Sequence, residues 1–129
     1  MKTYLIDTDV FIDFFKKRNQ AVQLIEHLST LGDFFVSVIT VAELRSGWTG
    51  KEGVIYLPKL YDIAQVIPVT KEIAESAGEY RQRYAQQGKR LPTIDLLIAA
   101  TAILRSCSLV TRNIKHYPMP ELDLYREIY

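Results

Sequence analysis

Short apolar segments typical of β-strands alternate along this chain with longer segments of helical period. The strand-like segments are 3–7, 34–38, 65–69 and 108–111, with a possible fifth near "LDLY". The first lacks strict alternation of apolar and polar residues, as expected of a strand covered on both faces. The order predicts βαβ units. We therefore expect one three-layer α/β/α domain over residues 1–129, with a central parallel sheet of four or five strands.

The segments between these strands carry helical signals. They are 9–17, 21–32, 40–48, 51–64, 70–88 and 92–106. Thr40 and Thr70 are candidate N-caps, and Gly32 and Gly88 are candidate stops. Pro58 lies inside the fourth segment, which weakens but does not remove its helical pattern. The sequence therefore predicts a helix after every strand except the last.

Composition restricts the classes of protein that the chain can represent. With 129 residues, 48% of them apolar and 24% charged, the chain can form a single domain with a real core. A net charge of +1 means that any affinity for nucleic acid must come from a local patch. The single cysteine, Cys107, excludes an internal disulfide. With no candidate membrane span or signal peptide, we expect a cytoplasmic protein that does not contact a membrane.

Acidic residues follow the strands in a pattern that predicts one site. Asp7 ends the first strand, Glu43 lies in the first predicted turn after the second strand, and Asp95 opens the helix before the fourth. The loop after the fourth strand adds Thr111, Arg112, Asn113 and His116. In open parallel sheets, ligands bind beyond the carboxyl ends of the strands. The three acids are therefore expected to share one crevice.

Three carboxylates in one crevice point to a bound cation. Like charges at close range raise one another's pKa and oppose folding unless a cation neutralises them. Oxygen ligands with no cysteine and little histidine favour Mg²⁺ or Mn²⁺ over Zn²⁺. Such an ion usually serves phosphate chemistry, so we expect a phosphodiester or phosphomonoester substrate.

Four sequence blocks carry a family resemblance. "YLIDTDVFID", "SVITVAEL", "TIDLLIAATAI" and "LVTRNIKHY" resemble, in order, the motif blocks of PIN-domain ribonucleases, specifically the VapC-like toxins of type II toxin–antitoxin systems. The blocks span residues 4–117. The resemblance implies a Mg²⁺-dependent endoribonuclease toxin that cleaves single-stranded RNA or RNA loops. It also implies that Asp7, Glu43 and Asp95 are the catalytic, metal-binding acids.

The fourth block departs from the usual family pattern. Many relatives carry an aspartate in this loop, whereas this chain has Asn113 and His116. Asn113 can still offer a neutral carbonyl oxygen to Mg²⁺, although a site with one charge fewer should hold the ion more weakly. Whether one or two ions bind therefore stays open.

Two other functions fit parts of the sequence. "LIDTDVF" also matches haloacid-dehalogenase-like phosphatases, in which Asp7 would be the nucleophile and Asp9 the general acid. That family needs further acids after the fourth strand, and "SLVTRN" has none. A non-catalytic PIN-like domain that binds RNA or serves as a scaffold is the other alternative, because the fourth aspartate is missing.

Basic and apolar residues suggest the partners. Lys89, Arg90, Arg112 and Lys115 flank the third and fourth blocks and are candidate RNA contacts, which would make binding salt-dependent. Segment 45–64 carries Arg45, Trp48, Tyr56, Leu57 and Tyr61, a large apolar surface for a small domain. By resemblance, this side takes a cognate antitoxin and a second copy of the chain, giving a homodimer and larger assemblies.

Several other polar residues have simple structural interpretations. Asp9 is a candidate N-cap for the first helix. Asp13 and His27 are expected on solvated helix faces. Cys107 is expected to be a buried small hydrophobe, and the eight tyrosines are expected mainly to pack.

Overall fold

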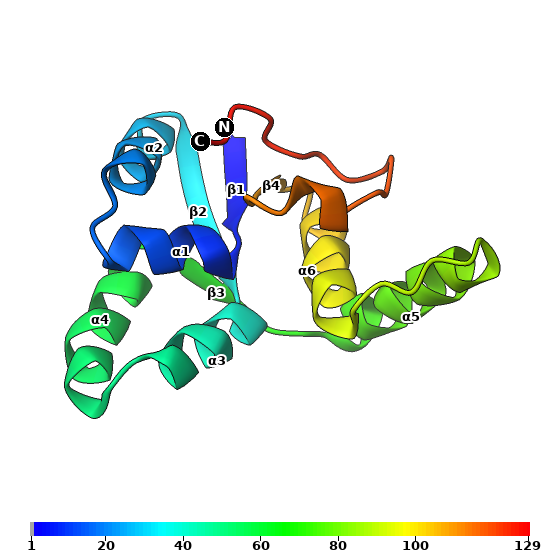
Figure 1. Ribbon diagram of the computed structural model, residues 1–129, viewed down its shortest axis with the longest axis horizontal. Helices are drawn as coiled ribbons and strands as arrows, with labels where there is room; N and C mark the ends of the chain where they lie inside the picture. The colour runs from blue at the N-terminus through cyan, green and yellow to red at the C-terminus, as the bar shows by residue number, and fades with distance from the viewer. Residues whose placement is uncertain (1) are drawn as a thin grey trace.

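Four parallel strands form the centre of the molecule, in the order β3-β2-β1-β4 (Figure 1). The computed structural model describes residues 2–129. The strands are β1 (Lys2–Ile6), β2 (Gly32–Ser37), β3 (Gln65–Ile67) and β4 (Ser108–Val110). The central strand β1 pairs with both β2 and β4, so its carboxyl end lies in the middle of one sheet edge. The predicted α/β fold with a parallel sheet is confirmed.

The sheet has four strands rather than five. Near the predicted "LDLY" strand, Leu124 forms only an isolated bridge with Leu109. The segment after β4 instead includes one short 3₁₀ helix, η1 (Ile114–His116), and then runs along the β4 edge. This backbone covers the exposed edge of β4 without extending the sheet.

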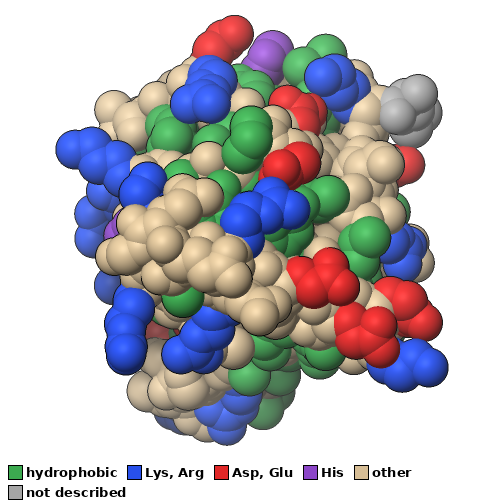
Figure 2. Space-filling model, turned by 90° about the vertical axis from the view of Figure 1, so that its right-hand side faces the viewer, with side chains coloured by type: hydrophobic (Ala, Val, Ile, Leu, Met, Phe, Trp, Pro, Cys, Tyr) green, Lys and Arg blue, Asp and Glu red, His purple; other side chains and the backbone are tan. Residues whose placement is uncertain are grey.

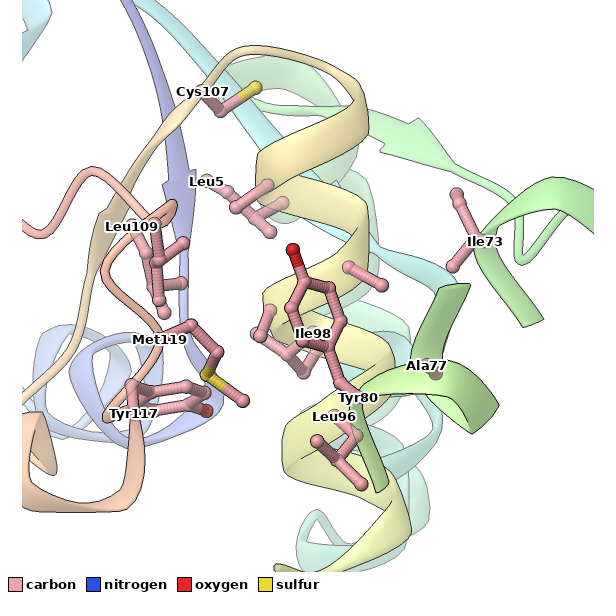
Figure 3. Close-up of a cluster of buried hydrophobic side chains, with 14 of the residues drawn as sticks. Leu5, Ile73, Ala77, Tyr80, Leu96, Ile98, Cys107, Leu109, Tyr117 and Met119 are labelled. Atoms are coloured by element: carbon pink, nitrogen blue, oxygen red, sulfur yellow. The ribbon is translucent and has the colours of Figure 1, made fainter. Parts of the chain in front are cut away.

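In the described part of the chain, residues 2–129, six α-helices cover the two faces of the sheet. They are α1 (Thr8–Phe15), α2 (Asn19–Ser29), α3 (Val38–Gly47), α4 (Gly50–Ile63), α5 (Lys71–Gln86) and α6 (Thr93–Leu104). Successive residues of β1 point to opposite faces, and each face has its own core. Leu5 packs in the core beneath α5 and α6 (Figure 3), whereas Tyr4 and Ile6 pack in the core with α1, α2 and α4. Both faces of β1 are therefore buried, as its sequence predicts.

The predicted stop at Gly32 is wrong. Helix α2 ends at Ser29, and the hydroxyls of Ser29 and Thr30 donate to the carbonyls of Glu26 and His27. Gly32 instead begins β2, where it pairs with Lys2. A β-carbon at Gly32 would lie 2.1 Å from the Lys2 carbonyl oxygen, so close approach of two strands explains the glycine.

Helix α3 begins earlier than its sequence suggests. Ser37 is its N-cap and accepts a hydrogen bond from the Ile39 N–H, so the prediction of Thr40 as N-cap is wrong. Thr40 is fully buried inside the helix. The earlier start moves Glu43 from the predicted first turn into the second.

The remaining helices agree better with prediction. Thr70 caps α5 as expected, and Gly88 follows the helix with φ of 77°, a conformation that favours glycine. Helix α4 accommodates Pro58 on its exposed side. Among residues 2–129, no helix has the length and apolar content needed to cross a membrane.

Candidate active site

Asp7 stands at the carboxyl end of the central strand and begins the site. Its backbone N–H donates to the Val110 carbonyl of β4 at 2.9 Å. One carboxylate oxygen, Oδ1, accepts from the Thr8 N–H at 2.8 Å, which makes Asp7 the N-cap of α1. The other, Oδ2, accepts from the Thr111 hydroxyl at 2.9 Å and the Tyr117 hydroxyl at 3.0 Å. Asp7 is thus buried and held by three donors.

Thr8 connects Asp7 to Glu43. The Thr8 hydroxyl donates to Glu43 Oε1 at 2.6 Å, a charge-assisted bond, while the Thr8 N–H holds Asp7. The Thr8 oxygen also lies 3.0 Å from the hydroxyl of buried Thr40. Since Thr8 has one hydroxyl proton, Thr40 can complete the chain by donating to Thr8. Glu43, in the second turn of α3, is thereby aligned beside the end of β1.

Asp95 approaches the same place from α6. It lies in the first turn of that helix, and its Oδ2 is 3.3 Å from His116 Nδ1. Burial is the main cause of a raised Asp95 pKa, and the charges of Asp7 and Glu43 raise it further, while His116 opposes the shift. Because Asp7 and Glu43 both raise the Asp95 pKa, the three carboxylates lie close enough to interact; that they share one metal-binding crevice stays a prediction.

The residues of this crevice fit a divalent cation. Asp7, Glu43 and Asp95 offer only oxygen ligands, and their mutual repulsion would be relieved by an ion. Within residues 2–129, no three His, Cys, Asp or Glu side chains are already arranged to hold a metal ion. Each of the three acids turns instead toward a protein donor. Ligation therefore requires side-chain rotation, which is easiest for partly exposed Glu43 and Asp95.

The loop after β4 contributes a hydrogen-bond donor to Asp7. Thr111 is fully buried, and its hydroxyl both donates to Asp7 and accepts from the Asn113 N–H at 3.1 Å. Asn113 is exposed at the start of η1. Its role as a metal ligand therefore stays a prediction.

Asp9 has a different role from the one predicted. Asp7 is the N-cap of α1, and Asp9 lies in the first turn, where it accepts from the Val10 N–H at 2.9 Å and the Arg112 N–H at 3.0 Å. Burial, followed by the nearby charge of Asp7, raises the Asp9 pKa to about 6. Asp9 thus anchors the loop after β4 beside the site.

Tyr117, like Thr8, is a site residue that sequence reasoning missed. It lies in the core beneath α6 and is 3% exposed, yet its hydroxyl donates to Asp7. Burial and the neighbouring acids Asp7 and Asp95 raise its pKa strongly, so it stays a neutral donor. The letters "KHY" of the fourth block were the available signal, but tyrosine is so common in cores that packing was the simpler interpretation.

The four basic residues predicted to contact RNA differ in their surroundings. Lys89, Arg90 and Lys115 are exposed. The Arg112 side chain is also 45% exposed, but its guanidinium donates to Asp13 at 2.9 Å. Asp13 is only 3% exposed, so its predicted place on a solvated face is wrong. The face that includes α5 shows Lys and Arg interspersed with Asp and Glu (Figure 2), consistent with a net charge near zero.

Segment 45–64 is partly packed and partly exposed. Trp48 and Tyr56 pack on Phe15 with ring centroids 5.1 and 5.2 Å apart, and Leu57 is half-buried. The exposed apolar residues of α4 are Val54, Ile55 and Tyr61, at 77%, 55% and 50%. A groove of about 420 Å³ runs between α1, α3 and α4, where Glu52 and Tyr56 of α4 line it, and it reaches Glu43.

The fold and site define a class: an open parallel α/β domain with neighbouring acidic residues beyond the end of its central strand. The PIN domain model matches residues 4–122, and the chain belongs to the PIN domain family. It is 32% identical to Ribonuclease VapC19 of Mycobacterium tuberculosis, over 92% of this chain and 96% of that protein. It is 30% identical to Ribonuclease VapC1 of Methanocaldococcus jannaschii, over 88% and 77%.

Solved structures agree with this assignment. VapBC2 from Rickettsia felis, bound to a DNA fragment from its promoter, superposes with a TM-score of 0.84 at 26% identity, over 95% of this chain and 97% of that one. A toxin–antitoxin complex from Klebsiella pneumoniae gives 0.77 at 29% identity, over 97% and 99%. The expected VapC-like member of the PIN family is confirmed.

Proposed function

We propose that this chain is a Mg²⁺-dependent endoribonuclease toxin of the VapC kind, with Mn²⁺ able to replace Mg²⁺. The observation that carries the proposal is that Thr8 bonds to both Asp7 and Glu43, from two different elements, while Asp95 of α6 lies close enough for both acids to raise its pKa. The relatives named ribonuclease VapC support the substrate class. We take single-stranded RNA or RNA loops as the substrate.

The candidate ligands would play different roles in holding a metal ion. Asp7 is fixed by its donors; Oδ2 already accepts two hydrogen bonds, but Oδ1 accepts only one and retains a second lone-pair direction for an ion. Glu43 is aligned by Thr8, and Asp95 is the adaptable third acid. Asn113 is the candidate fourth ligand. An ion held by these groups would polarise the scissile phosphate and activate the attacking water.

RNA would lie across the rim of this crevice. Lys89 and Arg90 precede α6, Lys115 lies in η1, and all three are exposed, so we assign them the phosphate contacts. Arg112 is the weaker candidate because its guanidinium is held by Asp13. Affinity that depends on phosphate contacts should fall steeply with salt. For single strands, the logarithm of the binding constant should fall against the logarithm of the salt concentration with a slope of roughly −0.7 per contact.

The antitoxin and a second copy of the chain are the proposed protein partners. Several structural neighbours are toxin–antitoxin complexes, which supports a cognate antitoxin for this chain. The groove that reaches Glu43 and the exposed apolar residues of α4 form the proposed interface region. Covering Val54, Ile55 and Tyr61 would remove apolar surface from water and so favour association.

The alternatives predict different behaviour. The phosphatase interpretation is set aside because the chain belongs to the PIN family. A non-catalytic scaffold would show neither metal-dependent cleavage nor a melting shift with Mg²⁺ or Mn²⁺.

A cleavage assay tests the proposal directly. The purified chain should cut a single-stranded RNA in Mg²⁺ or Mn²⁺, leave duplex DNA intact and stop in EDTA. Asp95→Asn is the matched control, because it changes one oxygen of the acidic crevice to nitrogen. Cleavage that persists in excess EDTA, or at the parent rate in Asp95→Asn, would contradict the metal mechanism.

A further inference from the structure

A second acidic centre lies one helical turn beyond the site. Asp13 sits in α1 with its side chain only 5% exposed, and it contacts two residues from the far end of the chain and one nearby in sequence. Arg112 Nη1 donates at 2.9 Å, the Tyr129 hydroxyl donates at 2.7 Å, and Arg18 Nε lies at 3.3 Å. None of these contacts takes part in the proposed chemistry.

Arg112 links this centre to the site. Its backbone N–H donates to Asp9 Oδ2 at 3.0 Å, while its guanidinium reaches Asp13. The preceding residue, Thr111, donates to Asp7 Oδ2 at 2.9 Å. Three acids at the start of the chain, Asp7, Asp9 and Asp13, therefore hold one two-residue stretch of the loop after β4.

The contacts around Arg112 restrict its motion. The Asp13 carboxylate binds the guanidinium, and the Tyr129 ring lies 5.6 Å from its central carbon, within cation–π range. With its backbone and side chain both anchored, Arg112 cannot shift without breaking a bond to Asp9 or Asp13. A shift of Arg112 would also move Thr111 and the hydroxyl that orients Asp7.

A purely stabilising role does not require this arrangement. Burying a carboxylate costs free energy, and buried ion pairs can often be replaced by apolar residues without loss of stability. An apolar pair could not reproduce the directional bond from the Arg112 guanidinium to Asp13. Arg112 also donates its backbone N–H to Asp9 beside the site. The geometry therefore favours a role in placing the loop.

We propose that Asp13 is a positioning residue of the active site, acting through Arg112 to hold Thr111 and hence Asp7 in the orientation that binds a metal ion. Tyr129 supports it by fixing the Asp13 carboxylate. This inference rests on the proposed function, since it assumes that Asp7 is a metal ligand. It also assigns Arg112 to positioning rather than to RNA binding.

Arg18 provides the matched control. It contacts the same carboxylate as Arg112 but is 61% exposed and makes no hydrogen bond to the loop after β4. Arg18→Gln removes one cation from Asp13 and leaves the path to Asp7 intact. Arg112→Gln removes the guanidinium that connects Asp13 to the loop after β4. Arg112→Lys keeps the charge but loses the planar guanidinium.

Metal binding without RNA is the measurement, because RNA contacts cannot influence it. The full-length parent and variants are titrated with Mn²⁺ while the melting temperature is followed, and the half-activating Mn²⁺ concentration and kcat are then measured with RNA. Arg112→Gln and Asp13→Asn should weaken Mn²⁺ binding on the order of tenfold, as is typical when the partner of a metal ligand is lost. Arg112→Lys and Tyr129→Phe should weaken it less, and Arg18→Gln should match the parent.

Each outcome decides the question. If Arg112→Gln melts lower without metal but binds Mn²⁺ as tightly as the parent, the Asp13 cluster is structural only and the inference is wrong. Equal loss of Mn²⁺ affinity in Arg18→Gln would also overturn it. If Asp13→Asn does not fold, Arg112→Lys and Tyr129→Phe still give the comparison. A parent that neither binds Mn²⁺ nor cleaves RNA would instead overturn the proposed function itself.

Discussion

The two sides of the acidic crevice are built very differently. On the β1 side, Asp7 is 8% exposed and accepts hydrogen bonds from a backbone N–H and two hydroxyls. On the α6 side, the Asp95 side chain is 20% exposed and is paired only with His116, which is itself 54% exposed. One acid is fixed in place by the fold, and the other is free to adjust.

This difference shows how a site can hold one carboxylate in place while another adjusts to the repulsion between the carboxylates. A carboxylate that accepts several hydrogen bonds is stabilised in its charged form, which offsets burial. Asp95 lacks such support, and its pKa is raised by burial and by Asp7 and Glu43. We infer that Asp7 provides the fixed ligand, whereas Asp95 bears most of the electrostatic strain that a cation would relieve.

Asp7→Asn should have the largest effect, because it removes a ligand and breaks the hydrogen-bonded side of the crevice. The amide NH₂ cannot accept from Thr111 and Tyr117, so a buried donor is left unpaired at a cost of about 1–3 kcal/mol. RNA cleavage should be lost and the metal-free unfolding midpoint in urea should fall. Near-parent cleavage would show that Asp7 is a structural acid.

Asp95→Asn should abolish cleavage with the opposite effect on stability. Since burial and repulsion raise the Asp95 pKa, the charged form is disfavoured in the folded state. A neutral amide removes that repulsion, so the metal-free variant should unfold at the same urea concentration as the parent or higher. Mg²⁺ should stabilise the parent and have much less effect on the variant. A clear loss of metal-free stability would contradict the proposed asymmetry.

The sequence predicted the fold and the acids better than it predicted the contacts that hold them. Alternating segments indicated the parallel sheet, and the position of Asp7 after an apolar strand indicated the crevice. Both inferences use local patterns and general rules for open α/β sheets. The boundaries of α3 were harder, because Ser37 and Thr40 are both suitable caps; the structure uses Ser37, and Thr40 hydrogen-bonds to Thr8 from inside the helix.

Long-range partners were not predictable from local patterns. Asp13 looks like an ordinary helix acid, and its burial depends on Arg112 and Tyr129, which lie about a hundred residues away in sequence. The hydrogen bond from Tyr117 to Asp7 likewise depends on the path of the chain after β4. Such pairings are decided by tertiary structure, and residue type alone leaves many alternatives.

The pH dependence of stability should report the burial of Asp9 and, after it, the nearby charge of Asp7. The Asp9 pKa is raised from 3.8 to about 6, so its neutral form is favoured in the folded state. That contribution is fully present below about pH 4 and is lost as pH rises through about 6. Metal-free parent should therefore lose stability relative to Asp9→Asn between these values. Parallel curves for the two proteins in urea unfolding would contradict this assignment.

Thr8→Val is the finest test of the fixed side of the crevice, because valine keeps the shape of threonine and removes only the hydroxyl. Glu43 would lose the 2.6 Å bond that aligns it, while the Thr8 N–H bond to Asp7 would be kept. The loss should be about 1 kcal/mol, the typical net contribution of one hydrogen bond. It should appear as a several-fold higher half-activating Mn²⁺ concentration with kcat nearly unchanged.

Thr8→Ser is the control for this change, since it restores the hydroxyl and should return the metal dependence toward that of the parent. Thr40→Val removes the group behind Thr8 without touching Glu43, so its effect on Mn²⁺ activation should be smaller than that of Thr8→Val. If Thr8→Val needs no more Mn²⁺ than the parent, Glu43 is aligned by the ion itself. The fixed side of the crevice would then consist of Asp7 alone, held by Thr111 and Tyr117.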